Sequence, residues 1–297
     1  MAPSGSSAGK QLESTWKLGG LTLSQLARRV IHGIQEDDLF GRASELAYNF
    51  LLALFPLLLF VLTLFGLFAS RSGELQTSLL SYFADFLPPS AFQLLKAITI
   101  EMAANATSGK LTFGIVLTLW FASGGTSSMI STLDAIYHVR ESRDWCRGRV
   151  IALGLTIAIL ILLITSLFIV LVGEDFTDWI GMRLHLKSIV VIAWKGLQWI
   201  AVVLFLTLSF SLIYYFGPSL GQRRWHWITP GSIFGECLWL AASAGLRIYL
   251  HFFNTYTATY GSLAAMMILL VWLYVTGLSF LIGGEINAQI ERTAMGG

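Results

Sequence analysis

Ionisable side chains within long apolar stretches are the residues of this sequence most able to do chemistry. Glu236 and Arg247 stand inside one such stretch, and Asp134 and Glu285 stand near the ends of two others. A charge at membrane depth costs at least about 2.5–3.5 kcal/mol, so it normally faces a bundle interior or a water-filled cavity. With nearby polar residues they give the candidates for lining a cavity or binding a substrate: Glu45, Tyr48, Asn49, Ser123, Thr126, Ser127, Asp134, Glu236, Arg247, Glu285 and Asn287.

Glu236 and Arg247 are 11 residues apart, which is three turns, so one face of a helix would carry both. At about 16.5 Å along the helix axis they cannot pair with each other. We expect both to face one interior polar cavity; the alternative is that each has a purely structural partner. The cavity would be bordered by Ser123, Thr126 and Ser127, with Glu285 near its cytosolic mouth.

Three of the carboxylates, Glu45, Asp134 and Glu285, fall at the predicted cytosolic ends of apolar stretches. A carboxylate at a helix end can reach water or pair with a loop arginine such as Arg140. For these three residues the sequence therefore leaves a structural role and a cavity role open.

The segment "FASGGTSSMI" (121–130) contains seven small or hydroxylated residues in a row. Helices in lipid associate through close packing of small residues, and Ala122, Gly125 and Ser128 would form such a face. Alternatively, Gly124 and Gly125 break the helix and expose backbone groups to a substrate, as in transporters. The residues considered for helix packing or hinges are Pro56, Gly124, Gly125, Pro218 and Gly283.

Catalytic and metal-binding signatures are missing from the sequence. The five histidines form no HxxxH or HxH pair, and HExxH and GxSxG are absent. The acidic cluster Glu36–Asp38 is typical of a solvated turn after an amphipathic helix. We therefore expect no enzyme, no catalytic residue, no metal and no cofactor, and the formal net charge of +2 gives no indication of a nucleic-acid partner.

Composition places the chain in a membrane. Hydrophobic residues make up 55% of it and charged residues 12%, about half the usual charged share of a soluble domain. About 20 apolar residues in a helix cross the hydrocarbon layer. The sequence predicts an all-α integral membrane protein with six transmembrane helices, at about 46–70, 111–134, 150–172, 196–217, 229–251 and 262–285.

Lysine and arginine set the predicted orientation. With a cytosolic N-terminus, the inside segments hold 12 of these residues and the outside loops hold six. Because cytoplasmic loops carry the excess of positive charge, we expect both termini in the cytosol.

The predicted organisation has four parts. Residues 1–20 form a disordered tail, 21–43 a cytosolic amphipathic helix and turn, 44–288 the six-helix membrane domain, and 289–297 a C-terminal tail. The amphipathic helix carries its apolar stripe on Leu23, Leu26, Val30 and Ile34, and we expect it on the membrane surface. The outer loop 71–110 repeats this pattern and predicts either packed helices or a mobile lid.

Five sequence blocks carry a resemblance to a known family. They are "ASELAYNFLLALFPLLLF" (43–60), "STLDAIYHVRESRDWCRGRVIALGLT" (131–156), "YYFGP" (214–218), "TPGSIFG" (229–235) and "TYGSLAAMMILLVWLYVTGLSFLIGGEINAQI" (259–290). Over residues 20 to 290 the chain resembles the YihY/BrkB family of bacterial inner-membrane proteins. The resemblance implies six transmembrane helices, and it brings an old ribonuclease label as well as links to serum resistance and lipid export.

These observations predict a multi-pass protein of the bacterial inner membrane that works as a transporter or flippase-like exporter. Its solute would be small or amphipathic, and lipid-related by the resemblance. The alternative is an envelope scaffold or assembly factor that transports nothing, whereas the scattered histidines argue against a ribonuclease. The expected partners are the lipid bilayer and the solute, with no nucleic acid; a homo-oligomer is left open.

Overall fold

A computed structural model describes residues 18–69, 108–141, 143–184, 187–220, 228–252 and 262–296. The regular elements in these ranges are all helical, as the sequence predicts. In chain order they are η1 (Leu18–Gly20), α2 (Leu23–Glu36), α3 (Leu39–Ala69), α6 (Ser108–Ile136), α7 (Trp145–Leu184), α8 (Lys187–Phe216), α9 (Pro230–Phe252) and α11 (Ser262–Gly296).

Each of the six predicted spans overlaps one long helix, from α3 to α11. Among the described residues, four segments are long and apolar enough to cross a membrane. They are Trp145–Ser166 in α7, Gly196–Phe216 in α8, Pro230–Leu250 in α9 and Met266–Ala294 in α11. Several helices extend beyond the predicted spans; α7, with 40 residues, is about 60 Å long, twice the hydrocarbon thickness.

The chain divides into two compact units. The larger contains residues 1–49 and 126–297, and the smaller contains residues 50–125. The division falls inside α3 and α6, so each of these helices contributes to both units. The site considered below lies in the larger unit.

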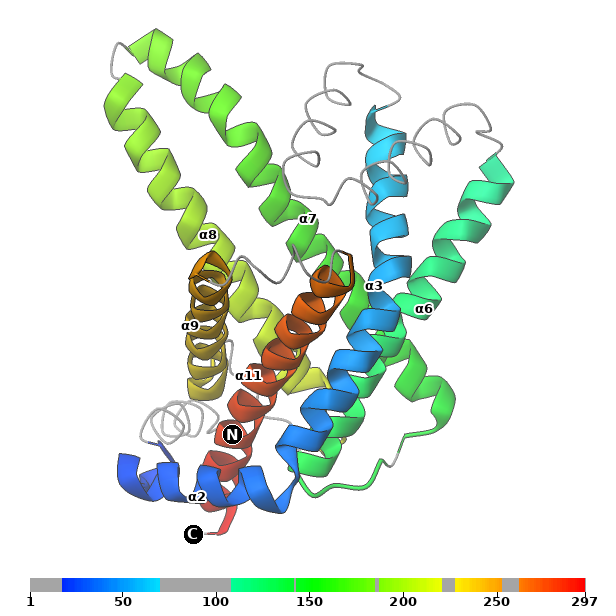
Figure 1. The fold of residues 1–297 in the computed structure, drawn as a ribbon, viewed down its shortest axis with the longest axis vertical. Helices are drawn as coiled ribbons and strands as arrows, with labels where there is room; N and C mark the ends of the chain where they lie inside the picture. Colours follow the sequence, from blue (N-terminus) through cyan, green and yellow to red (C-terminus); the bar gives the residue numbers. More distant parts are fainter. Residues whose placement is uncertain are drawn as a thin grey trace, which may run out of the picture. The chain divides into compact units, whose positions relative to one another are not determined.

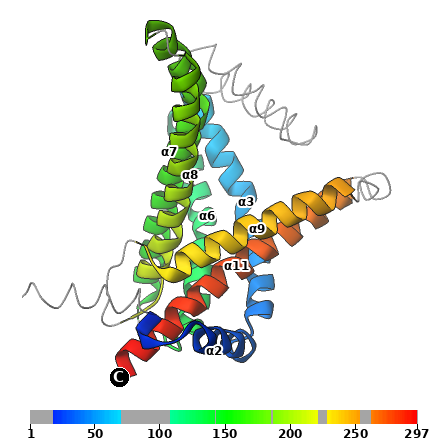
Figure 2. The same ribbon diagram turned by 90° about the vertical axis from the view of Figure 1, so that its left-hand side faces the viewer.

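Two helix pairs form much of the larger unit: α7 lies beside α8, and α9 lies beside α11 (Figures 1 and 2). The α9–α11 pair depends on glycine, because a Cβ atom at Gly283 would lie 2.5 Å from the Gly231 carbonyl oxygen. Ser279 and Gly235 lie in the same contact. Gly283 therefore lies in a close contact between α9 and α11.

The most deeply buried apolar side chains gather where the beginning of α3 and the end of α6 meet α11. A Cβ atom at Gly284 of α11 would lie 2.8 Å from a methyl group of Leu133, and one at Gly277 would lie 3.3 Å from Leu46. The fully buried side chains at this contact include Leu46, Leu133 and Ile136.

Local signals in the sequence set the helix ends. Thr22 caps α2 in a capping box with Gln25. Pro230 is the first residue of α9, a position where its missing N–H costs nothing. Pro218 follows the end of α8 at Phe216, so it stops a helix and does not kink one.

The amphipathic helix packs on the protein itself. Leu26 and Val30 of α2 are buried against Ile286 and Ile290 of α11, while Leu23 is exposed. Part of the stripe that we assigned to the membrane surface thus covers α11. The predicted C-terminal tail at 289–297 is wrong for most of its length, because α11 continues to Gly296 and its last turns support α2.

The small-residue segment of α6 is continuous helix through Gly124 and Gly125, so the broken-helix alternative is not seen. Within the smaller unit, a Cβ atom at Gly125 would lie 3.4 Å from both Phe50 and Ala53 of α3, whereas one at Gly124 would meet nothing within 4 Å. Gly125 therefore packs closely against α3, and Gly124 does not take part.

Two expectations concern other parts of the smaller unit. Helix α3 continues past Pro56 without a break. Most of the outer loop 71–110 lies outside the described residues.

Candidate functional site

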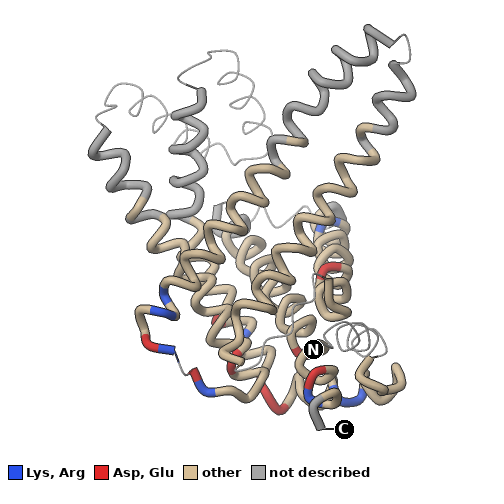
Figure 3. Tube along the Cα trace, turned by 180° about the vertical axis from the view of Figure 1, so that it is seen from behind, with Lys and Arg blue, Asp and Glu red and all other residues tan. Residues whose placement is uncertain are grey.

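Charged residues are unevenly distributed in the larger unit. Most of those described gather around α2, the connection from α6 to α7, and the C-terminal end of α11 (Figure 3). Helix α9 differs, because it carries Glu236 and Arg247 within its candidate span. The unit therefore has two kinds of polar site, one at the helix ends and one within the helices.

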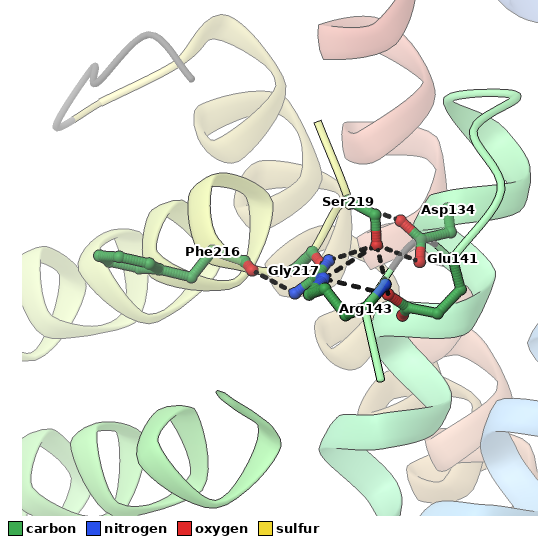
Figure 4. Close-up of polar contacts among 6 residues, drawn as sticks. All are labelled: Asp134, Glu141, Arg143, Phe216, Gly217 and Ser219. Carbon is green, nitrogen blue, oxygen red and sulfur yellow. Dashed lines mark hydrogen bonds and ion pairs between the residues drawn. The ribbon is translucent and has the colours of Figure 1, made fainter. Parts of the chain in front are cut away.

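The helix-end site is a polar cluster centred on Ser219, which follows α8 (Figure 4). Its backbone N–H donates to Asp134 Oδ1 at 2.5 Å, and its hydroxyl lies 3.0 Å from Asp134 Oδ2. The same hydroxyl lies 2.8 Å from Glu141 Oε1. Asp134 ends α6 and is buried, so this cluster ties the end of α6 to the segment after α8.

Arg143 supplies the cation of the cluster. Its Nε donates to the Ser219 hydroxyl at 3.0 Å and lies 3.1 Å from Glu141 Oε1. Its guanidinium also donates to the backbone carbonyls of Phe216 and Gly217 at the end of α8. These carbonyls have no intrahelical partner, and a nearby cation is favourable at a helix C-terminus.

The electrostatics of the cluster are visible at Glu141, which lies in the connection outside the spans. Partial burial would raise the pKa of its carboxyl, but hydrogen bonds from Ser219 and the Arg143 backbone, with the Arg143 charge, lower it below its ordinary 4.5. The arrangement stabilises negative charge and holds three segments together. It resembles a clamp more than a binding cavity.

The site within the helices is the contact of Glu236 with Thr207 of α8. Glu236 lies two turns into α9 and is 4% exposed. Its Oε2 is hydrogen-bonded to the Thr207 hydroxyl, which also lies 2.9 Å from the Val203 carbonyl oxygen one turn earlier on α8. Glu236 Oε1 has no hydrogen-bond partner in the described part of the chain.

A second buried hydroxyl lies on the same face of α8. Ser211 is four residues after Thr207, so the two side chains stand one turn apart. The Ser211 hydroxyl is buried and, like Glu236 Oε1, lacks a hydrogen-bond partner among the described residues. Helix α8 thus carries a second buried hydroxyl one turn from the one that contacts Glu236.

The structure does not place Arg247 with Glu236. Arg247 is exposed, although both residues lie on nearly the same side of α9. The physical reason is the helix crossing, because α9 diverges from α8 beyond the Glu236 contact (Figure 2). The expectation that one enclosed face serves both charges is therefore wrong for Arg247.

Glu285 is fully buried beneath α2, where a Cβ atom at Gly33 would collide with its carboxyl group. Gln289 donates to Glu285 Oε1 at 2.7 Å, and Arg292 lies 3.9 Å from Oε2. Arg292 also donates to the Ile136 carbonyl oxygen at 2.6 Å. Glu285 therefore lies in a covered ion pair.

Asn287 binds backbone. Its Oδ1 accepts from the Gly231 N–H at 3.0 Å, and its amide nitrogen donates to Thr229 Oγ1 at 3.0 Å, so it fixes the start of α9 on α11. Tyr214 supports the same region from α8 by donating to the Phe280 carbonyl oxygen at 2.6 Å.

Comparison with known proteins identifies the family. The model of the family described as virulence factor BrkB matches residues 30–296. The chain belongs to the virulence factor BrkB family. It is 31% identical over 256 residues to a Bacillus subtilis (strain 168) protein named ribonuclease-like protein YfkH, covering 85% of this chain and 90% of that protein.

Other relatives of this BrkB-family chain are named UPF0761 membrane proteins. The one from Tolumonas auensis is 27% identical over 279 residues, covering 91% of this chain and 86% of its own length. The one from Photobacterium profundum, PBPRA3489, is 29% identical over 276 residues, covering 90% and 80%. With the apolar helices, these relatives show that the chain is a membrane protein; no solved structure matches it.

The other candidates of this BrkB-family chain lie apart from both polar sites. Glu45 and Tyr48 of α3 are exposed, and Asn49 donates to Ser128 at 3.0 Å, which joins α3 to α6. The Thr126 hydroxyl lies 2.8 Å from that of Thr156 on α7. Ser127 is half-buried.

Ser123 is buried in the smaller unit, where its hydroxyl donates to the Trp120 carbonyl oxygen at 2.7 Å. This satisfies its donor within α6 itself. A border formed jointly by Ser123, Thr126 and Ser127 stays a prediction.

Sequence reasoning missed Thr207, Ser211, Arg143 and Ser219. The hydroxyls were overlooked because a lone threonine or serine in an apolar stretch commonly bonds its own helix. Their spacing, Thr207 and Ser211 one turn apart, was the available signal. No group of three His, Cys, Asp or Glu side chains that could hold a metal occurs in the ranges that the structure describes.

Proposed function

We propose that this BrkB-family chain is a multi-pass protein of the bacterial inner membrane that exports a small or amphipathic, lipid-related solute. Helices α3, α6, α7, α8, α9 and α11 would cross the membrane, with both termini in the cytosol. The four apolar segments among the described residues support the spans, and the excess of Lys and Arg in the inside segments supports the orientation.

The observation that carries the proposal is the buried carboxyl of Glu236 within the candidate span Pro230–Leu250. One of its oxygens lacks a hydrogen-bond partner in the described structure, and a buried unsatisfied polar group costs about 1–3 kcal/mol. A helix that only anchors a protein gains nothing from such a group. Polar groups inside membrane helices typically belong to substrate or ion pathways.

Reconstitution tests the proposal directly. The full chain is placed in liposomes of phosphatidylethanolamine and phosphatidylglycerol that contain a trace of fluorescent phosphatidylethanolamine and an entrapped small anionic dye. We expect one of these probes to cross the membrane faster than in protein-free liposomes, with the rate reduced several-fold in Glu236→Gln. Glu45→Gln, which changes an exposed carboxylate, is the matched control.

If neither probe crosses with the correctly oriented wild-type chain, the export proposal is abandoned. The envelope scaffold or assembly factor then becomes the better description. The orientation has its own test, because a reporter active only in the periplasm, fused after Gly297, should stay inactive.

We also propose that the chain is not a nuclease, whatever the name of its Bacillus subtilis relative indicates about that protein. The Asp37 carboxylate of the acidic turn already has a partner, because its Oδ1 lies 2.7 Å from His138 Nε2. Purified protein should leave RNA intact with and without divalent metal. Metal-dependent cleavage that disappears in Asp37→Asn or Asp38→Asn would contradict this.

A further inference from the structure

The hydrogen bonds around Thr207 contain one proton too few for an ionised Glu236. A hydroxyl has one proton to donate and can also accept. The two groups in contact with Thr207 Oγ1 are the Val203 carbonyl oxygen and Glu236 Oε2. If Glu236 is a carboxylate, both partners are acceptors and the hydroxyl can donate to only one of them.

Threonines in the same setting elsewhere in the larger unit do not have this deficit. Thr276 also donates to a carbonyl one turn earlier, Trp272, at 2.8 Å, but its other partner is a donor, the indole N–H of Trp239 at 2.9 Å. Thr156 donates to the Ala152 carbonyl oxygen at 2.7 Å and receives the proton of a second hydroxyl, that of Thr126. In both cases two protons serve two hydrogen bonds.

We infer that Glu236 is a proton-binding site: with α8 and α9 packed together, Oε2 carries a proton and donates it to Thr207 Oγ1, and Thr207 donates to Val203. Every donor and acceptor in this chain of hydrogen bonds is then used once. When the proton leaves to water, the Thr207 hydroxyl turns its own proton toward Oε2 and gives up the Val203 carbonyl oxygen. One proton is lost, the Glu236–Thr207 hydrogen bond is kept with its direction reversed, and the hydroxyl bond to Val203 is given up.

The charged groups around Glu236 do not compensate an ionised carboxylate. Helix α8 presents Thr207 and Ser211, and its Tyr214 is bonded to Phe280. Helix α11 packs on α9 with Trp272 and Thr276, and its carboxyl at Glu285 is held by Gln289 and Arg292. On α9 itself Arg247 is exposed three turns away, and within the described residues Glu236 has no ion pair.

Burial makes the neutral acid the favoured form. An isolated ionised carboxylate in apolar surroundings is costly enough that such a group commonly neutralises instead. Release of the proton would then require water to reach Glu236, which means that the α8–α9 contact has to open. A role of Glu236 in coupling protons to export rests on the proposed function, but proton binding itself does not.

Infrared difference spectroscopy across a pH titration tests the site in the full chain purified in liposomes. We expect the wild-type protein at neutral pH to show the carbonyl stretch of a protonated carboxylic acid that Glu236→Gln lacks. Because Glu285 is also buried, Glu285→Gln is measured in parallel and should retain the Glu236 band. Thr207→Val should shift the band. Thr165→Val should not, because Thr165 is exposed on α7 and donates to the Ile161 carbonyl oxygen of its own helix.

Three results would overturn the inference. A carboxylate stretch in place of the acid band at neutral pH would show an ionised Glu236. A change caused by Na⁺ at constant pH would show a metal-cation site. An unshifted band in Thr207→Val would show that Glu236 does not donate to the Thr207 hydroxyl. This variant leaves Glu236 itself unchanged, so the test still holds if Glu236→Gln does not fold.

Failure of export and failure of proton binding are distinguishable. The spectrum requires no transported solute, so an acid band without flux in liposomes retains the proton site and removes the exporter. Flux in liposomes together with an ionised Glu236 retains the exporter and removes the proton site.

Discussion

Asp134 and Glu236 are buried carboxyl groups in the same unit, and each is hydrogen-bonded to a hydroxyl group from another segment. The cluster around Asp134 contains the guanidinium of Arg143. The contact around Glu236 contains only hydroxyls and a backbone carbonyl among the described residues.

The difference follows from position in the chain. Asp134 ends α6, where the connection to α7 can supply an arginine long enough to reach the end of α8. Glu236 lies two turns inside α9, where its neighbours come from other apolar helices and a cation would itself be costly. A carboxyl in the connection beside the helix ends, such as Glu141, can therefore be stabilised as an anion, whereas one within the helices is stabilised more readily by a proton.

The largest expected effect comes from removing the cation at the helix ends. Arg143→Met leaves Glu141 without its positive partner, and it leaves the Ser219 hydroxyl and two carbonyls of α8 without a donor. Hydrogen bonds to a charged group contribute about 1.5–3 kcal/mol, and the loss of several of them should cost about 3 kcal/mol in total. Chemical unfolding of the purified protein measures it, with the exposed Arg140→Met as control. Equal losses in both variants would show that the cluster is not a clamp.

The next effect concerns the packing that supports the helix of Glu236. Gly283→Ala places a methyl group against Gly231 and Tyr214 and should cost about 2 kcal/mol, as overpacking typically does. Gly245→Ala is the matched control on α9, because a Cβ atom there meets nothing within 4 Å. It should be neutral or stabilise by up to about 1 kcal/mol. Similar thermal midpoints in the two variants would contradict the close α9–α11 contact.

Apolar run length and periodicity were sufficient to predict the long helices. The six predicted spans each overlap one helix, because a long apolar run in lipid has to form its backbone hydrogen bonds within itself, whatever it packs against. Helix extensions such as residues 289–296 were missed, since polar turns beyond an apolar run are ordinary helix formers once Ile290 packs against α2. The same tertiary contact covers the stripe that was assigned to the membrane surface.

The site was only partly predictable. Cost arguments placed Glu236 and Asp134 among the candidates, and both are buried. They also included Arg247, because periodicity describes one helix and not the angle at which the next one crosses it. Partners far apart in sequence, such as Thr207 for Glu236, depend on that crossing. Helical spacing indicates a face of a helix but not what lies opposite.

Neutral isosteres sharpen the comparison of the two carboxyls. Asp134→Asn disturbs the two hydrogen bonds that Asp134 makes with the Ser219 backbone N–H and hydroxyl, and it should cost about 1–2 kcal/mol. Glu236→Gln replaces a neutral acid by a neutral amide and should change the free energy of unfolding by less than about 0.5 kcal/mol. Unfolding of both variants at neutral pH measures the difference. A larger loss at Glu236 would indicate that the wild-type group is ionised.

The smallest effect is the pH dependence at Glu141. Burial opposes its ionisation, but the Ser219 and Arg143 hydrogen bonds and the Arg143 charge hold the pKa of this carboxyl below its ordinary 4.5. A group whose pKa is lowered by folding stabilises the protein above its unfolded pKa, and this contribution is lost as the pH falls through the folded value. The thermal midpoint of the wild type should therefore exceed that of Glu141→Gln at neutral pH, and the two midpoints should converge in acid below pH 4.5.

Asp134 titrates in the same cluster, so the difference between the two proteins is the quantity to follow, with Glu45→Gln as the exposed control. A difference that persists unchanged in acid would mean that Glu141 acts through packing and not through its charge.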